Sequence, residues 1–486
     1  MQDLSFFSGT EAWVGDFLKL LPQERSILRN YTWNAAHITH ANAGFHVGVG
    51  LILLSQIAPT KGIRLSSRSK PSSNIFVLNL APTGQAKTES IHIGETVGKE
   101  AGLITLTTNP PGSREGLIDS LDDQHPDLNG RPKQALLYPE FADFLSITTA
   151  GGRGRSAGHA ATMRASFMAI FDGGSATRVL AAARNRETGE VHETKRGTET
   201  PVVSMIGAAN YRVLTQHTTE DDWHSGFVGR YLMIDGEMER YYPQVQPWPD
   251  SMQNVIDVIR WRLMLEQNRY INNNPLFPLP SEDREYGAYY PDARARMDRW
   301  ATDMHLSGRS ESNGLVAAAL PRLQPLCARI ATLLCFDFGE ASGLDTGGVP
   351  LPGWRIGLRE VEAAIYLTER HLQSYRYAAS HVVLNEEERP IRDVETALRR
   401  ADAGGRMLTE GQISADTART MRTVGDALVT LMSRGVVRKV QPAEGTPGIR
   451  YQIVDGFTDK VVALYPTVQP AIPAVASATA APRLIF

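Results

Sequence analysis

The chain has 486 residues, of which 42% are apolar and 21% charged, and it is long enough for two or three globular domains with a large core. A net charge of −3 excludes a protein that is basic over its whole surface, so any nucleic-acid surface must be a local patch. Cys327 and Cys335, eight residues apart in an apolar helical pattern, are expected to pack in the core rather than to bind metal. Low cysteine usage without a recognisable signal peptide predicts a cytoplasmic protein. The apolar run over residues 47–57 is too short to span a bilayer, and no membrane role is expected.

Residues 1–70 are predicted to form a helical N-terminal region. Trp13, Phe17 and Leu21 recur at helical spacing, and a second helix is expected over residues 44–58. The basic, serine-rich segment that follows either contacts phosphate or forms a solvated connector.

Residues 74–103 carry the strongest chemical signal in the sequence. An apolar strand over residues 75–80, a loop of small residues and a helix over residues 89–101 form the context of a phosphate-binding P-loop. In such a loop, backbone N–H groups and the helix N-terminus face phosphate oxygens. Lys87 is expected to reach the β- and γ-phosphates of ATP, and Thr88 to ligate Mg²⁺. The predicted nucleotide-binding residues are Ala81, Pro82, Thr83, Gly84, Gln85, Ala86, Lys87 and Thr88.

Both outer glycines of the motif G-x-x-x-x-G-K-[ST] are alanines here, Ala81 and Ala86. Alanine has less access than glycine to positive φ, so the loop must use fewer such positions. The alternative is an ordinary strand–turn–helix in which Lys-Thr is accidental.

A strand over residues 103–107 and a helix over residues 114–121, with Ser113 as its N-cap, are expected next. A further strand is expected over residues 134–138.

Pro139 and Glu140 stand at the end of that strand. P-loop ATPases have Asp-Glu at this place: the Asp holds Mg²⁺ through water, and the Glu polarises the attacking water. Glu140 suits the second role. With Pro139 in the first position, either the carboxylate for magnesium comes from elsewhere, with Asp143 nearby, or hydrolysis is impaired. The alternative is an ordinary strand end with a surface glutamate.

Residues 151–164 are rich in Gly and Arg and either contact nucleic-acid phosphates or form a surface loop. The helix expected over residues 160–171 ends at Asp172. Residues 178–200 predict a β-hairpin, followed by strands over residues 202–208 and 231–234. The hairpin either contacts a nucleic-acid backbone or is a solvated ribbon. Its arms carry the candidate DNA-binding residues Arg184, Arg186, Lys195 and Arg196.

Residues 241–385 are predicted to be helical, and Arg322 and Arg329 lie on one face of the helix over residues 315–335. Residues 386–460 read as three short helices followed by a two-stranded ribbon, an order typical of a winged helix. Its recognition helix would present Arg419 and Arg422 to DNA, although such modules also serve as protein contacts. Residues 461–486 are predicted to be a disordered tail.

The order of these motifs resembles the AAA+ ATPase module over residues 40–380, specifically its helicase branch, which includes the minichromosome-maintenance helicases. It is also similar to the primase-helicase-type ATPases of phages, plasmids and integrated elements. The loop APTGQAKT resembles the form in which alanine precedes the lysine, and LLYPEF matches the Walker B place at Glu140 but departs from it at Pro139.

The resemblance also implies roles for residues outside the loop. The basic hairpin resembles the pre-sensor hairpin that touches DNA, and Asn210 lies where the sensor-1 polar residue sits. Arg230, in GFVGRYLMI, matches the arginine finger offered to a neighbouring subunit. Arg322, in LPRLQPLCARIATLL, resembles the sensor-2 arginine that acts within its own subunit.

This resemblance implies an α/β fold: a P-loop AAA+ core with a mainly parallel sheet over residues 71–240, a helical lid and a small winged-helix domain. It further implies ATP and Mg²⁺ as cofactors, DNA as partner, and a homo-oligomeric ring that is expected to be a hexamer. The leading hypothesis is an ATP-dependent DNA translocase or helicase acting in replication of a phage or mobile element. The alternatives are an ATP-binding, weakly hydrolysing scaffold or loader, and a DNA-binding regulator.

Overall fold

The computed structural model divides into two compact units, Met1–Val382 and Val383–Phe486. The finer division into five regions stays a prediction. Structure is described for residues 2–24, 26–58, 73–108, 110–122, 133–148, 155–179, 183–184, 191–192, 195–199, 201–218, 220–241, 246–272, 288–309, 311, 313–338, 355–380, 388–403, 406–433, 436–440 and 449–453. The predicted basic connector over residues 60–70 and the predicted tail over residues 461–486 lie outside these residues.

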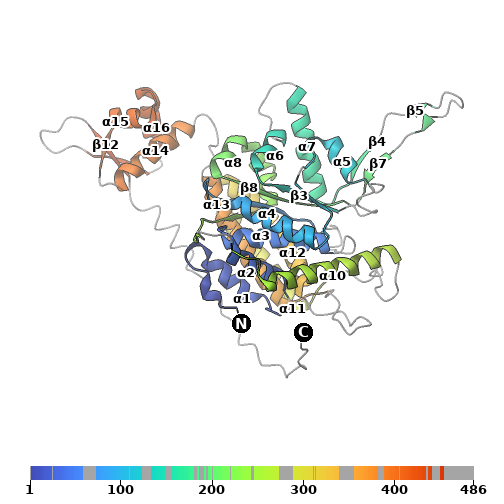
Figure 1. Ribbon diagram of the computed structural model, residues 1–486. Helices are drawn as coiled ribbons and strands as arrows, with labels where there is room; N and C mark the ends of the chain where they lie inside the picture. Colours follow the sequence, from blue (N-terminus) through green and yellow to red (C-terminus); the bar gives the residue numbers. More distant parts are fainter. Residues whose placement is uncertain are drawn as a thin grey trace. The chain divides into compact units, whose positions relative to one another are not determined.

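A five-stranded parallel sheet forms the centre of the first unit (Figure 1). Its strand order is β2-β3-β8-β1-β9. Its strands are β1 (Phe76–Leu80), β2 (Leu106–Thr107), β3 (Lys133–Tyr138), β8 (Val202–Ala209) and β9 (Tyr231–Asp235). Every residue of β1, β3 and β8 is buried, as expected for parallel strands covered on both faces. The predicted parallel sheet is therefore confirmed. The strand predicted over residues 103–107 is limited to β2, because residues 104–105 form a turn after the preceding helix.

Helices cover both faces of this sheet (Figure 1). On one face lies α3 (Ala43–Ile57), whose residues are all buried; a Cβ placed on Gly48 would lie 2.7 Å from a methyl group of Val77. The neighbouring residue of β1, Phe76, points to the opposite face, because side chains alternate along a strand. There its ring packs on Phe171 of α7 (Arg155–Phe171), with centroids 4.8 Å apart. Helix α7 begins five residues earlier than predicted, within the Gly/Arg-rich stretch.

The remaining helices around the sheet either precede β1, as the first two named here do, or lie between strands along the chain. These are α1 (Ala12–Leu20), α2 (Ile27–Ile38), α4 (Lys87–Glu100), α5 (Arg114–Ser120), α6 (Phe141–Thr148), α8 (Tyr211–His217) and α9 (Glu220–His224). Helix α5 is capped as predicted, since the Ser113 hydroxyl accepts the N–H of Gly116 (3.1 Å).

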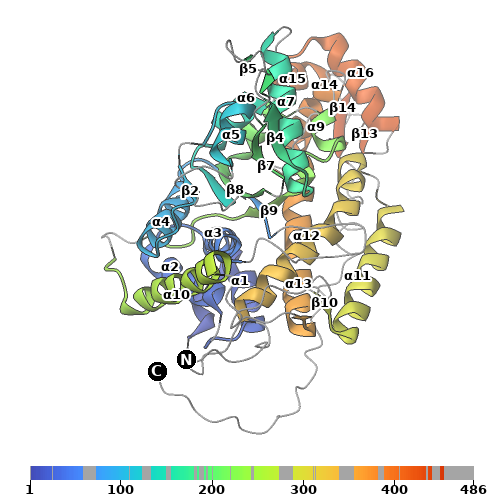
Figure 2. The same ribbon diagram turned by 90° about the vertical axis from the view of Figure 1, so that its right-hand side faces the viewer.

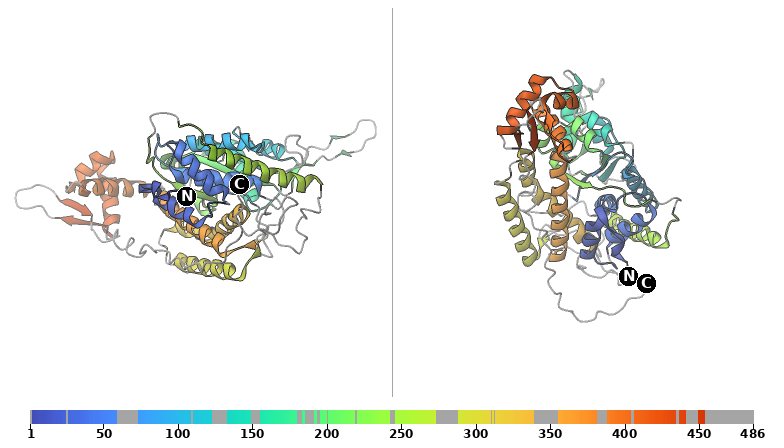
Figure 3. Two further views of the ribbon diagram at one scale, coloured as in Figure 1. Left: turned by 60° about the horizontal axis from the view of Figure 1, so that its bottom comes forward. Right: turned by 90° about the vertical axis from the view of Figure 1, so that its left-hand side faces the viewer.

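Four further helices form the predicted helical region: α10 (Asp250–Asn272), α11 (Pro291–Arg309), α12 (Gly314–Phe338) and α13 (Leu358–Ser380). Helices α11, α12 and α13 pack on one another (Figures 2 and 3). Helix α13 also covers the open edge of β9, where Nδ1 of His371 accepts the N–H of Met233 (2.9 Å). This contact satisfies a donor that an edge strand would otherwise leave unpaired.

The predicted basic hairpin is confirmed. Strand β4 (Ala176–Val179) pairs antiparallel with β7 (Lys195–Thr198), and β5 (Ala183–Arg184) pairs with β6 (Val191–His192). This ribbon extends away from the parallel sheet (Figure 1).

The second unit contains α14 (Glu388–Ala403), β12 (Leu408–Thr409), α15 (Glu410–Thr417), α16 (Met421–Ser433), β13 (Val437–Val440) and β14 (Arg450–Ile453). The strands form an antiparallel sheet in the order β12-β14-β13. The three helices and the β13–β14 ribbon were predicted, whereas the short strand β12 was not. The core of the second unit includes Val394, Leu398, Ile413, Val424, Leu428 and Tyr451.

Candidate functional site

The predicted phosphate loop joins the end of β1 to the start of α4, at the carboxyl edge of the sheet. Gly84 has φ +83° and Ala86 has φ 52°, so both adopt the left-handed conformation. Ala81, by contrast, does not have a positive φ. Of the two glycines that are replaced by alanine, only the one at position 86 stands where the backbone favours glycine. The loop therefore keeps a left-handed residue before the lysine at the expense of one strained alanine.

Lys87 is the first residue of α4, and its ammonium group turns back onto the loop. Nζ donates to the carbonyl oxygens of Ala81 (2.9 Å) and Pro82 (2.7 Å). Burial lowers the pKa of Lys87, and the negative charge of Glu140 acts in the opposite direction. The lysine is thus held beside the backbone that would surround a phosphate group.

The ends of β3 and β8 bring two more predicted residues to this edge. Tyr138 pairs with Gly207, and Leu80 with Ala209, so the three strands end side by side. Glu140 follows β3 and is exposed near Lys87.

Asn210 follows β8, and its Nδ2 lies 3.5 Å from the Thr83 hydroxyl of the loop. Its Oδ1 accepts the N–H of Val213 (2.7 Å) and so caps α8, which fixes the side chain. Lys87, Glu140 and Asn210 therefore converge on one edge of the sheet, as a nucleotide site requires.

Pro139 also lies at this edge, beside Thr88. The Thr88 hydroxyl donates to the carbonyl oxygen of Pro139 at 3.4 Å. Within the described residues, no group of three or more His, Cys, Asp or Glu side chains could hold a metal ion by itself. The donors present fit a magnesium ion that arrives bound to phosphates and takes the Thr88 hydroxyl as its protein ligand.

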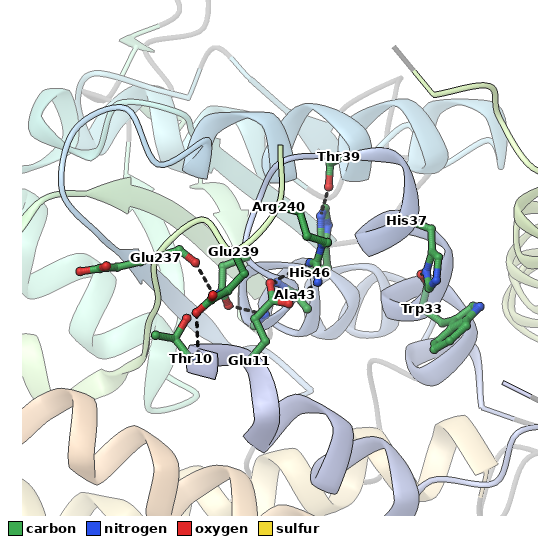
Figure 4. Close-up of polar contacts among 12 residues, drawn as sticks. Thr10, Glu11, Trp33, His37, Thr39, Ala43, His46, Glu237, Glu239 and Arg240 are labelled. Carbon is green, nitrogen blue, oxygen red and sulfur yellow. Dashed lines mark hydrogen bonds and ion pairs between the residues drawn. The ribbon is translucent and has the colours of Figure 1, made fainter. Parts of the chain in front are cut away.

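The segment 236–241, directly after β9, contacts both the loop and the N-terminal part of the chain, and Figure 4 shows its contacts with the N-terminal part. The N–H of Met238 donates to Oε1 of Gln85 in the loop (2.6 Å). Arg240 pairs with the fully buried Glu11, with Nη2 and Oε1 2.7 Å apart. Burial raises the pKa of Glu11, and Arg240 opposes that shift. Further contacts of this segment join Glu237 to Asn42 and Glu239 to Thr10.

Arg370 of α13 is a candidate residue that the sequence motifs did not single out. It donates to Oδ1 of Asp235 (2.8 Å), which also accepts the Ser374 hydroxyl (2.5 Å). Asp235 ends β9 and pairs in register with Leu80, the residue before the loop. Arg370 therefore reaches the carboxyl edge of the sheet on its β9 side. Helix α13 lies in the region predicted to be helical, but it carries several arginines. Only the docking of α13 on β9 distinguishes Arg370 from the others.

Arg230 and Arg322 lie at the opposite, amino edge. Arg230 directly precedes β9, whose first residue pairs with Phe76, the first residue of β1. The length of β1 separates this edge from the loop by roughly 13 Å. Arg322 donates to the carbonyl oxygen of Ser225 (3.0 Å). Arg322 was expected to act on the nucleotide of its own subunit. It lies instead at the amino ends of the strands, because α12 runs past them.

Several of the predicted DNA-binding residues form ion pairs with acidic side chains of the same chain. On the hairpin, Lys195 pairs with Glu199, and Arg196 lies 3.3 Å from Asp122. In the second unit Arg419 pairs with Asp393 (2.7 Å), whereas Arg422 is exposed. Arg184 lies in β5, and Arg186 falls outside the described residues. No helix in the described part of the chain is long and apolar enough to cross a membrane.

No family model and no curated protein sequence matches the chain. Among solved structures, it is similar to one titled "SCCmec type IV Cch - active helicase". The two are 10% identical with a TM-score of 0.29, over 85% of this chain and 68% of the other. Similarity at this level carries no argument about the fold or the activity.

Proposed function

We propose that this protein binds ATP with Mg²⁺ at the loop between β1 and α4 and hydrolyses it to move along DNA. The observation that carries the proposal is the convergence of Lys87, Glu140 and Asn210 at the carboxyl edge of a parallel sheet. Ligands of open α/β sheets bind at this edge. The resemblance to helicase-branch ATPases supports replication of a phage or mobile element as the setting.

Each residue has a distinct task under this proposal. Lys87 neutralises phosphate charge, and Thr88 offers its hydroxyl to the magnesium ion that the nucleotide brings. Glu140 accepts a proton from the water that attacks, and Asn210 orients it from the end of β8. Arg370 adds a cation from the lid helix, at the β9 side of the loop.

Arg230 and Arg322 cannot serve the loop of their own chain from the amino edge of the sheet. We assign them to the phosphate of a neighbouring copy, which requires a closed homo-oligomeric ring, expected to be a hexamer. Such a ring would present the hairpin to DNA, with Arg184, Arg186, Lys195 and Arg196 contacting the backbone without reading sequence. The second unit, with the element order of a winged helix, would add Arg422, while Arg419 stays paired with Asp393.

The test is the ATPase rate with and without DNA, measured together with the mass of the protein in the presence of nucleotide. Lys87→Ala should lower turnover by at least about 100-fold, because a cation that meets developing charge is lost. Lys99→Ala is the matched control, since that lysine lies on the same helix and pairs with Glu95. Turnover that DNA leaves unchanged contradicts the motor. Turnover that survives Lys87→Ala contradicts the site.

Pro139 favours a second candidate, a protein that binds ATP and hydrolyses it only weakly, as a scaffold or loader. The Thr88 hydroxyl meets a main-chain carbonyl of Pro139 where other P-loop ATPases supply a carboxylate. In that case Glu140→Gln leaves the slow turnover unchanged, whereas in a motor it abolishes DNA-stimulated hydrolysis.

A further inference from the structure

Three arginines gather around the C-terminal end of α7, at the amino edge of the sheet: Arg230, Arg322 and Arg329. Arg329 is buried and donates to the carbonyl oxygen of Phe171, the last residue of α7 (2.5 Å). Arg322 and Arg230 donate to the carbonyl oxygens of two consecutive residues, Ser225 and Gly226 (3.0 and 2.7 Å). Burial lowers the pKa of Arg329 to about 10, with Asp172 opposing that shift and Arg230 adding to it. The three guanidinium groups thus share one electrostatic environment.

Asp172, the residue after α7, is the carboxylate that faces these groups. It binds Arg230 through both oxygens, Oδ1 to Nε (3.3 Å) and Oδ2 to Nη2 (2.5 Å). The Asp172 side chain is 53% exposed, whereas that of Arg230 is 7% exposed. With Nη1 bound to Gly226, each nitrogen of the Arg230 guanidinium has a partner within its own chain.

We propose that Asp172 is a latch that holds Arg230 away from a neighbouring subunit until that subunit presents a nucleotide phosphate. The inference rests on the proposed function, because it gives Arg230 a phosphate to serve. A guanidinium fork binds a carboxylate and a phosphate with the same two-bond geometry. Asp172 therefore occupies the position in the fork that a phosphate would take.

Charge decides when the latch opens. In a separate subunit, releasing Asp172 would leave the nearly buried Arg230 unpaired beside Arg322, which is costly. A nucleotide phosphate carries more negative charge than one carboxylate. Replacing Asp172 with the phosphate as the partner of Arg230 therefore favours the open state, in which Asp172 is released. The exposed Asp172 side chain can then rotate toward solvent, while Arg230 stays paired with an anion, the phosphate. The latch thus couples release of Arg230 to the arrival of a nucleotide-loaded copy.

Turnover per chain, measured over a range of protein concentrations, tests the latch with Asp172→Asn. The substitution removes the charge but keeps the size, so assembly no longer has to break an ion pair. Because the Asp172 carboxylate is half-exposed, solvent offsets part of the cost of releasing Arg230. The protein concentration at half-maximal turnover should therefore fall by about two- to fivefold. Glu362→Gln is the matched control: Glu362 binds Arg296 through two bonds (2.7 and 3.2 Å) in the helical region. It should leave that concentration unchanged.

A double variant separates a latch from a structural ion pair. Turnover depends on Arg230, so in this comparison the midpoint is read from the mass of the assembled protein over the same concentrations. If Asp172 acts through Arg230, the gain from Asp172→Asn disappears when Arg230→Ala is also present. A gain that persists in the double variant overturns the latch, and so does a concentration midpoint that stays the same or rises. A wild-type protein whose turnover is absent, or independent of concentration, overturns the ring and the latch together. Normal concentration-dependent turnover with an unresponsive Asp172→Asn variant overturns the latch alone.

Discussion

The Thr88 hydroxyl lies 3.4 Å from the carbonyl oxygen of Pro139, so the first turn of α4 is joined to the end of β3. This contact places residue 139 beside the predicted magnesium ligand. It also shows why the proline matters: its main chain is in reach, but it offers no carboxylate.

Pro139→Asp should therefore lower the Mg²⁺ concentration needed for half-maximal ATP turnover. A carboxylate beside Thr88 adds a negative oxygen donor, the kind that Mg²⁺ prefers. Pro139→Ala controls for loss of the proline ring. An identical magnesium requirement in the two variants would show that residue 139 does not approach the ion.

Arg370→Ala should weaken ATP binding by about 10-fold or more, the range for a lost charge-assisted hydrogen bond. The reason is its position beside Asp235, in register with the residue before the loop. Calorimetry with a non-hydrolysable ATP analogue measures the affinity. Arg376→Ala is the control, because Arg376 is on the same helix and pairs with Glu311. Equal losses in both variants would assign the effect to the helix rather than to Arg370.

Ala86→Gly should raise the free energy of unfolding by roughly 0.5–1 kcal/mol, because glycine relieves the left-handed backbone. Ala318→Gly, within the right-handed helix α12, should lower it by about 0.5–1 kcal/mol. Denaturant unfolding of both variants measures the difference. If Ala86→Gly also destabilises the protein, the φ of 52° carries no strain.

His371 should make the protein less stable as the pH falls. Burial lowers its pKa from 6.5 to about 3, so the folded state keeps it neutral while the unfolded chain takes up a proton. Its stabilising contribution is complete above pH 6.5. Below that it is lost as the pH falls toward about 3, at ~1.4 kcal/mol per pH unit.

His371→Gln keeps an acceptor for the N–H of Met233 and cannot titrate. Unfolding measured between pH 4 and 7 should show a pH slope smaller by one proton than that of the wild type. His46, buried with a pKa also lowered to about 3, remains in both proteins. An unchanged slope would mean that His371 is protonated in the folded state.

Arg422→Ala should weaken DNA binding and reduce the salt dependence of log K by about 1, as expected for one lost phosphate contact. Arg419→Ala should instead mainly destabilise the second unit, because Arg419 is paired with Asp393. Fluorescence anisotropy at several salt concentrations, with thermal unfolding alongside, separates the two effects. If Arg422→Ala binds DNA like the wild type, α16 does not face the DNA backbone.

Local sequence determined the parts of this protein that depend on neighbouring residues. The apolar run before the loop, the Ser113 cap and the basic hairpin were predicted, because strand burial, capping and turn formation act over a few positions. The loop itself was recognised from its small residues and Lys-Thr, although its left-handed Ala86 was not.

Only the tertiary structure decided which edge of the sheet each distant residue reaches. Arg322 and Arg370 lie on separate predicted helices, and nothing in the spacing of either residue reveals its distance from the loop. Packing of α12 takes Arg322 to the amino ends of the strands, and docking of α13 on β9 brings Arg370 to the carboxyl ends. These contacts join residues 97 and 135 positions apart. They follow from how helix and sheet surfaces fit, which a local pattern does not record.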